Sequence, residues 1–157
     1  MTSDPVTPIR VAIVDDEALA RTVLREYLAA VPGVEVVAEC ANGFEAVKVV
    51  SEQHPDLLLL DVQMPKLNGF EVLDLVGRDV AVIFVTAYDQ YAIRAFDARA
   101  IDYLLKPVDD ARFEAALERV REHVSSRNAA DQRDQLFNLI AEITGSGEIA
   151  IDRKSVV

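Results

Sequence analysis

The pattern of apolar and polar positions along this chain predicts strands that alternate with helices. Three apolar runs are almost unbroken, as expected for strands covered on both faces of a sheet: Ile9–Val14, Leu57–Leu60 and Val80–Val85. Two weaker runs, Val34–Cys40 and Ile101–Leu105, are interrupted by charge, and we place one at each edge of the sheet. Helical patterns follow the runs, so the sequence predicts an α/β fold with a parallel five-stranded sheet and helices on both faces.

Five segments carry apolar residues at the spacing of a helix with one buried face. The first ends at Pro32-Gly33, the second begins after a capping residue, Asn42, and the third ends at Gly77. The predicted helices are Leu19–Val31, a segment with Phe44, Val47 and Val50, Phe70–Val76, Gln90–Ala98, and a helix from Asp109 or Asp110 to Val124.

The length of 157 residues suits one domain and an extension, because single domains commonly have about 100 to 150 residues. Residues 9–124 form the predicted α/β domain, after a disordered lead-in over residues 1–8. Residues 125–147 are predicted to be a linker with a short amphipathic helix, and residues 148–157 a tail or the opening of a further element. The polar residues 125–134 fit either a linker or a solvated continuation of the preceding helix. The apolar residues of the linker helix are Leu136, Phe137, Leu139, Ile140 and Ile143.

The charge and composition narrow the possible partners. The net charge of −11 would repel a nucleic-acid backbone, so we expect no direct nucleic-acid binding by this chain. No apolar run approaches the roughly 20 residues that cross a bilayer, and residues 1–8 lack the features of a secretory signal. The single cysteine, Cys40, fits a reducing compartment. We therefore expect a cytoplasmic protein with no membrane partner.

Polar residues stand where four of the apolar runs end: Asp15 with Asp16, Asp61, Thr86, and Lys106 with Pro107. Parallel strands bring their carboxyl ends to one edge of a sheet, so these residues are expected to form one crevice. Three carboxylates so close together repel one another unless a hard cation or protons intervene. Mg²⁺ prefers oxygen ligands and open acidic sites, and the backbone carbonyl of Gln63 offers a further oxygen.

Asp61 directly follows the third of these strands and is the predicted nucleophile. A carboxylate can accept a phosphoryl group, while the ammonium of Lys106 and the hydroxyl of Thr86 stabilise the phosphoryl oxygens. Alone, each residue has an ordinary explanation, such as a capping acid at a helix N-terminus or a turn. Tyr103 is either a packing residue or a side chain with two rotamers that responds to Thr86. Because these residues together follow strands whose ends meet, their placement favours a phosphoryl-accepting site over the ordinary explanations.

Four motifs resemble the receiver domain of bacterial response regulators over about residues 9–124: Val-Asp-Asp-Glu at 14–17, Leu-Asp-Val-Gln-Met-Pro at 60–65, Val-Thr-Ala at 85–87 and Leu-Lys-Pro at 105–107. The resemblance implies a flavodoxin-like fold with strand order 2-1-3-4-5. The stretches at 86–96 and 100–107 look like the subclass that carries a LytTR-type DNA-binding output domain.

The same resemblance implies a role for each site residue. Asp61 accepts phosphate from a sensor histidine kinase, and Asp16, Asp61 and the Gln63 carbonyl hold Mg²⁺. Asp15 assists through water, and Lys106 contacts the phosphoryl group. Thr86 and Tyr103 are the conformational pair, and the bond before Pro107 is cis. The chain would be a phosphoacceptor that supports its own phosphorylation and dephosphorylation, and not a turnover enzyme.

The resemblance also implies an output face made of the fourth helix, the fifth strand and the fifth helix. In this family such a face commonly pairs two receivers, so we expect phosphorylation-dependent dimerisation. A DNA-binding domain of about a hundred residues has no room before Val157, so DNA contact is expected only through an output domain missing here. Complementary charges are expected on that face from Tyr91, Arg94, Asp97, Arg99, Asp102, Arg112 and Arg119.

Two other functions share this fold class. A Mg²⁺-dependent phosphatase with an aspartyl nucleophile would resemble Asp-x-Asp, but Gln63 stands in place of the second carboxylate and cannot transfer the proton. A flavin- or nucleotide-binding module would want a glycine-rich loop after the first strand, where this chain has Asp15, Asp16 and Glu17. Both alternatives are less favoured than the receiver interpretation.

Overall fold

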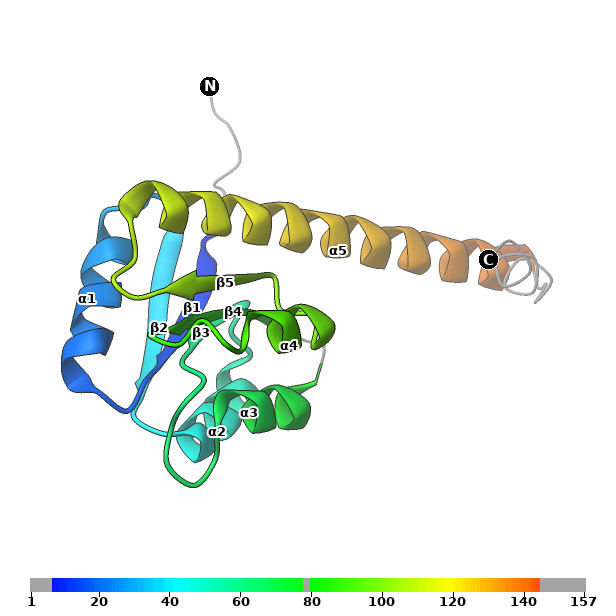
Figure 1. Ribbon diagram of the computed structural model, residues 1–157. Coiled ribbons are helices and arrows are strands. Elements are labelled where there is room, and N and C mark those ends of the chain that lie inside the picture. The colour runs from blue at the N-terminus through cyan, green and yellow to red at the C-terminus, as the bar shows by residue number, and fades with distance from the viewer. Residues whose placement is uncertain (1–6, 78–79, 145–157) are drawn as a thin grey trace. The chain divides into compact units, whose positions relative to one another are not determined.

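The computed structural model describes residues 7–77 and 80–144, and the predictions for residues 1–6 and 145–157 lie outside this part. Five parallel strands form one sheet in the order β2-β1-β3-β4-β5 (Figure 1). The predicted fold class is confirmed, with β2 and β5 at the two edges. The strands are β1 (Ile9–Val14), β2 (Val34–Cys40), β3 (Leu57–Leu60), β4 (Ala81–Thr86) and β5 (Asp102–Leu105).

Helices follow the strands and cover both faces of the sheet. They are α1 (Ala18–Ala29), α2 (Gly43–Gln53), α3 (Gly69–Val76), α4 (Ala92–Asp97) and α5 (Asp110–Thr144). Helices α2 and α3 lie side by side (Figure 1). Successive strand residues point to opposite faces, so Leu58 and Leu60 join the core beneath α2, α3 and α4. On the other face, α1 contacts α5 through the rings of Tyr27 and Phe113, whose centroids lie 5.6 Å apart.

Local hydrogen bonds explain where two of the helices begin. The side chain of Asn42 accepts a hydrogen bond from the Glu45 backbone N–H at 2.9 Å, as the sequence predicts. At α3, Asn68 and Glu71 form a reciprocal capping box. Helix α4 is shorter than the predicted segment Gln90–Ala98, and its preceding residue provides no side-chain cap.

Gly69, the first residue of α3, holds the loop after β3 close to the helix. A Cβ atom at this position would collide with the backbone carbonyl of Asp61 and press against the ring of Phe84. Only glycine leaves room for this approach. The close fit places Asp61 directly beneath the start of α3.

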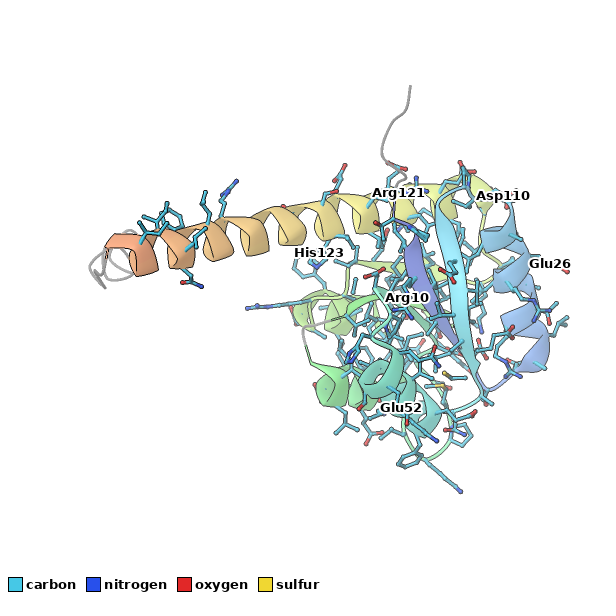
Figure 2. All side chains as sticks on the ribbon, turned by 180° about the vertical axis from the view of Figure 1, so that it is seen from behind. Arg10, Glu26, Glu52, Asp110, Arg121 and His123 are labelled. Carbon is cyan, nitrogen blue, oxygen red and sulfur yellow. The ribbon has the colours of Figure 1, made fainter. Side chains whose placement is uncertain are left out.

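Arg10, the second residue of β1, bonds to the connection between α2 and β3 (Figure 2). Its guanidinium donates hydrogen bonds to the carbonyls of Gln53 and His54, at 2.7 and 3.0 Å. Its backbone N–H also donates to Asp56 at 2.9 Å. The α2–β3 connection is thereby tied to β1.

Helix α5 continues past Val124, so of the two alternatives for residues 125–134 the structure has the continued helix and not the linker. Residues 125–134 lack large apolar groups, but they also lack glycine and proline, so a helix that has already formed can propagate through them. The contacts divide the chain into two units, residues 1–121 and 122–157. In the second unit, Leu136, Leu139 and Ile143 expose more than half of their surface. No helix in the described ranges is long and apolar enough to span a bilayer.

Candidate functional site

The carboxyl ends of β1, β3, β4 and β5 carry Asp15, Asp61, Thr86 and Lys106, which lie in one region of the fold. Backbone hydrogen bonds between neighbouring strands align these ends. The Asp61 N–H donates to the Val14 carbonyl at 3.0 Å, and the Lys106 N–H donates to the Thr86 carbonyl at 2.8 Å. The four side chains are therefore held by the sheet itself, as expected from the parallel topology.

Three carboxylates converge at this edge. Asp15, Asp16 and Asp61 each place one oxygen within 4.8 Å of the others. Asp15 and Asp61 are buried, while Asp16 is exposed. Such a cluster of hard oxygen atoms, open on one side, suits a divalent cation that keeps part of its water shell.

Lys106 partly compensates this negative charge. Its ammonium lies 2.7 Å from an oxygen of Asp15 and 3.3 Å from an oxygen of Asp61. Burial alone would lower the pKa of Lys106, but the hydrogen bond to Asp15 and the charges of both carboxylates raise it. Lys106 is therefore a cation at neutral pH, positioned against the same acids.

Asp61 retains one oxygen without a partner. Its Oδ2 atom contacts Lys106, but its buried Oδ1 atom has no hydrogen-bond partner among the described residues. Burial raises the pKa of Asp61, the charge of Lys106 opposes this rise, and the charge of Asp15 adds to it. A buried carboxylate oxygen without a donor is costly. This oxygen therefore indicates that a cation or an incoming group belongs beside it, so the residues present fit a bound Mg²⁺.

Thr86 and Tyr103 meet at the backbone of Tyr88. The Thr86 hydroxyl accepts a hydrogen bond from the Tyr88 N–H at 3.4 Å, and the Tyr103 hydroxyl donates to the Tyr88 carbonyl. Burial raises the pKa of Tyr103, so its hydroxyl keeps the proton that it donates. The loop between β4 and α4 thus connects the site to β5. The Lys106–Pro107 peptide bond is cis.

Residues 11–118 match the family model described as response regulator receiver domain. The chain belongs to this family.

Relatives and solved structures agree with this assignment. The chain is 44% identical over 124 residues to the transcriptional regulatory protein BtsR of Escherichia coli K12, covering 78% of this chain and 52% of that protein. It is 46% identical over 122 residues to an uncharacterized response regulatory protein of Yersinia pestis, covering 76% and 51%. The chain thus spans about half the length of these relatives.

Two receiver structures resemble the fold. The response regulator domain of Thermotoga maritima CheB is 34% identical, with a TM-score of 0.62, over 73% of this chain and 95% of that domain. The receiver domain of AraT, a response regulator from Geobacillus stearothermophilus, is 32% identical, with a TM-score of 0.66, over 76% and 97%. This chain is therefore a two-component receiver domain with an acidic cluster at its strand ends.

The receiver domain uses Gln63 in a way that the sequence analysis missed. Gln63 lies two residues after Asp61, and its side-chain amide donates a hydrogen bond to the hydroxyl of Tyr91 at 2.8 Å. The sequence offered no signal for this contact, because the two residues are 28 positions apart and belong to different loops. Only the backbone carbonyl of Gln63 was considered there.

The expected output face of the receiver domain contains charges that pair within the chain. Asp102, at the start of β5, lies 2.6 Å from Arg112 and 3.1 Å from Arg119, both on α5. Burial alone would raise the pKa of Asp102, but the hydrogen bond and charge of Arg112 lead the effects that hold it below its usual range. This face also exposes three apolar side chains that the sequence analysis did not single out, namely Ile93, Phe96 and Leu105.

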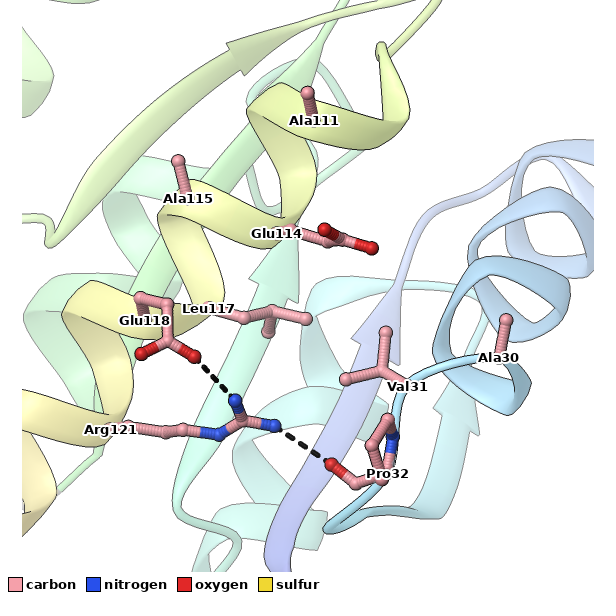
Figure 3. A pocket seen from close by; sticks show the side chains of 9 residues that line it. All are labelled: Ala30, Val31, Pro32, Ala111, Glu114, Ala115, Leu117, Glu118 and Arg121. Atoms are coloured by element: carbon pink, nitrogen blue, oxygen red, sulfur yellow. Dashed lines mark hydrogen bonds and ion pairs between the residues drawn. The ribbon is translucent and has the colours of Figure 1, made fainter.

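The described part of the chain has two surface pockets near α1. One, next to the acidic cluster, is lined by α1 residues such as Leu19 and Val23 together with Lys106 and Pro107. The other lies between the end of α1 and α5, where Arg121 donates a hydrogen bond to the Pro32 carbonyl at 2.8 Å and pairs with Glu118 (Figure 3). Arg121 therefore ties α5 to the turn before β2.

Proposed function

We propose that this receiver domain accepts a phosphoryl group on Asp61 from a sensor histidine kinase and controls an output domain that binds DNA. The observation that carries the proposal is the environment of Asp61. This buried carboxylate has one oxygen without a partner, and it lies beside two further acids and the ammonium of Lys106. The transcriptional role rests on the similarity to the transcriptional regulatory protein BtsR of Escherichia coli K12.

The proposed transfer is a nucleophilic substitution at phosphorus. A carboxylate oxygen of Asp61 forms a bond to phosphorus while the bond from phosphorus to the donor histidine nitrogen breaks. The leaving imidazole takes up a proton from water. The product is an aspartyl phosphate, in which the charge on the phosphoryl oxygens must be balanced nearby.

Asp15, Asp16 and Asp61, with the backbone carbonyl of Gln63, would hold Mg²⁺ as ligands or through water. When bound, the ion offsets the charges of the carboxylates and of the phosphoryl oxygens. Lys106 supplies a fixed positive charge from the carboxyl end of β5, because its ammonium already contacts two of the three acids. The hydroxyl of Thr86 turns toward the phosphoryl group as a further donor.

The Tyr88 backbone carries this change to the output face. When Thr86 reorients toward the phosphoryl group, its hydroxyl releases the Tyr88 N–H. The Tyr88 carbonyl is the acceptor for Tyr103, so the loop and Tyr103 move together. Tyr103 lies on β5, beside the face formed by α4, β5 and α5. Thr86 and Tyr103 therefore act as the conformational pair.

The changed face then pairs with a second copy of the chain. Ile93, Phe96 and Leu105 expose the apolar surface that such a contact buries. Asp102 is already paired with Arg112 and Arg119, so an exchange of these partners between two copies would preserve the ion pairs. We further propose that the output domain is of the LytTR type and that the protein acts in the cytoplasm.

Phosphorylation of Asp61 is tested by incubating the chain with Mg²⁺ and a small phosphodonor, then measuring intact mass. We expect one added phosphoryl group in the wild type and none in Asp61→Asn. Asp74→Asn, an exposed acid on α3, is the matched control and should be labelled as the wild type is. Labelling of Asp61→Asn at the wild-type rate would refute the proposal.

A further inference from the structure

The loop after β3, which contains Asp61 and Gln63, contacts the residue that precedes α4. This contact does not involve Thr86 or Tyr103. The side-chain amide of Gln63 donates a hydrogen bond to the Tyr91 hydroxyl at 2.8 Å. Gln63 stands two residues after Asp61, and Tyr91 directly precedes α4 as its N-cap residue. A displacement of the loop after β3 therefore acts directly on the start of α4 through this hydrogen bond.

The ring of Tyr91 is held in place by its neighbours, so its hydroxyl has a defined position. Its centroid lies 6.1 Å from that of Phe70 on α3 and 6.4 Å from that of Tyr88, both in edge-on geometry. The residue is half-buried against the core beneath α3 and α4. Aromatic pairs of this kind restrict the ring and leave the polar tip available for one directed bond.

Helix α4 has few other anchors in the described structure. It contains six residues, of which only Ala95 is buried. Arg94 lies over the Phe70 ring, 4.1 Å from its centroid, and adds a cation–π contact. A short helix with so little buried surface depends strongly on each remaining contact. The bond from Gln63 therefore adds a directed contact to the packing of α4 on the core.

We propose that Gln63 and Tyr91 form a latch that couples the acidic cluster to α4, separately from the route through Tyr88. Gln63 contributes its backbone to the loop beside Asp61 and its side chain to the helix. A cation bound at the acidic cluster shifts this loop and thereby changes the latch. The inference rests on the proposed function for the identity of the cation, but the hydrogen bond of the latch is itself present in the structure.

The test compares three variants by hydrogen exchange of the α4 amides. Tyr91→Phe removes only the hydroxyl, Gln63→Met removes only the amide, and the third variant carries both changes. A hydrogen bond of ordinary strength predicts that each single change speeds exchange at Ala95 and Ala98 by about 2- to 10-fold. The double variant should exchange no faster than the faster single variant, because both changes remove the same bond.

Tyr88→Phe is the matched control, since it removes a hydroxyl from the ring that neighbours Tyr91. It should leave α4 exchange within about 2-fold of the wild type. Addition of Mg²⁺ alone should change α4 exchange in the wild type and in Tyr88→Phe, and have no such effect in Gln63→Met. Additive effects in the double variant, equal effects in the control, or an unchanged Mg²⁺ response in Gln63→Met would each overturn the latch.

Labelling of Asp61 by a small phosphodonor separates this inference from the proposed function. Tyr91→Phe should still be labelled, because Tyr91 belongs neither to the acidic cluster nor to the proposed Mg²⁺ ligands. If the wild type is not labelled, the proposed function fails, while the exchange data without Mg²⁺ still decide whether the latch exists. If the wild type is labelled and exchange is unchanged, only the latch is refuted.

Discussion

Tyr103 is connected to Thr86 through a single residue, because the two side chains bond to the N–H and the carbonyl of Tyr88. The β4–α4 loop is therefore hydrogen-bonded to both residues of the proposed switch, Thr86 and Tyr103. A shift of the Thr86 hydroxyl toward a phosphoryl group removes one of these two bonds. The other bond then determines how the loop and β5 respond.

Tyr103→Phe should uncouple phosphorylation from the output face. The ring keeps its packing against Phe84, at a centroid distance of 6.3 Å, but loses the hydroxyl that bonds to Tyr88. We expect Asp61 labelling within about 2-fold of the wild type and a loss of phosphorylation-dependent dimerisation, measured by light scattering. Dimerisation of Tyr103→Phe at the wild-type concentration would contradict the role of this hydroxyl.

Asp61→Asn should stabilise the chain in the absence of divalent cations. Burial raises the pKa of Asp61 in the folded state, so the ionised form is disfavoured there relative to the unfolded chain. Below the ordinary pKa of 3.8, both states are protonated and the variant gains nothing from the lost charge. The gain should grow as the pH rises above that value and become constant above the folded pKa.

At pH 7 we therefore expect Asp61→Asn to melt at a higher temperature than the wild type, and at pH 3.5 the difference should be much smaller. Thermal melts at pH 3.5 and 7, with Asp74→Asn as the control, measure this difference. A variant that is less stable than the wild type at neutral pH would contradict the argument that burial disfavours the ionised form of Asp61.

Mg²⁺ should stabilise the wild type through the acidic cluster. A ligand that binds only the folded state adds about 2.7 kcal/mol at a concentration 100 times its dissociation constant. Asp16→Asn removes one exposed oxygen ligand and should weaken this stabilisation, and Asp61→Asn should nearly abolish it. Calorimetric melts at several Mg²⁺ concentrations test this, and an equal Mg²⁺ shift in all three proteins would place the ion elsewhere.

Phe96→Ser should prevent phosphorylation-dependent dimerisation. Phe96 on α4 exposes 83% of its surface, so its removal costs the folded monomer little, while a paired face loses a large apolar contact. We expect at least about a tenfold weaker dimer, measured by sedimentation with an acyl-phosphate analogue bound. Phe44→Ser is the control, because Phe44 is similarly exposed but lies on α2. Equal weakening by both changes would mean that the effect is not specific to α4.

Cys40 should be unreactive in the folded chain. It exposes 1% of its surface at the end of β2, and burial raises the pKa of its thiol to about 11. The thiolate is the reactive form, so an aromatic disulfide reagent at pH 8 should modify native chain at least about 100-fold more slowly than unfolded chain. Rapid modification of the native protein would show that the end of β2 opens.

Parts of the fold follow from local patterns. Leu57–Leu60 is fully buried because β3 lies between two neighbouring strands and has helices on both faces. A charged side chain there would have no solvent around it, so such a strand is an unbroken apolar run. The same reasoning places Asp15, Asp61, Thr86 and Lys106 together, since parallel strands share one carboxyl edge. These relations need only strand order and direction. They could therefore be inferred from residue types along the chain.

Other features depend on contacts between distant residues. The bond from Gln63 to Tyr91 and the pairing of Asp102 with two arginines join segments with no common sequence period. The sequence left the length of α5 open, because residues 125–134 fit either a linker or a solvated continuation of the helix, and helix propagation does not require apolar residues.

The amino-acid pattern thus determined the α/β architecture and which residues share the acidic edge, because burial and strand direction act on each element separately. The tertiary structure alone decided which hydrogen bonds link that edge to α4 and β5. Side-chain bonds of this kind depend on distances of a few ångströms between separate elements, and only the packed fold sets those distances.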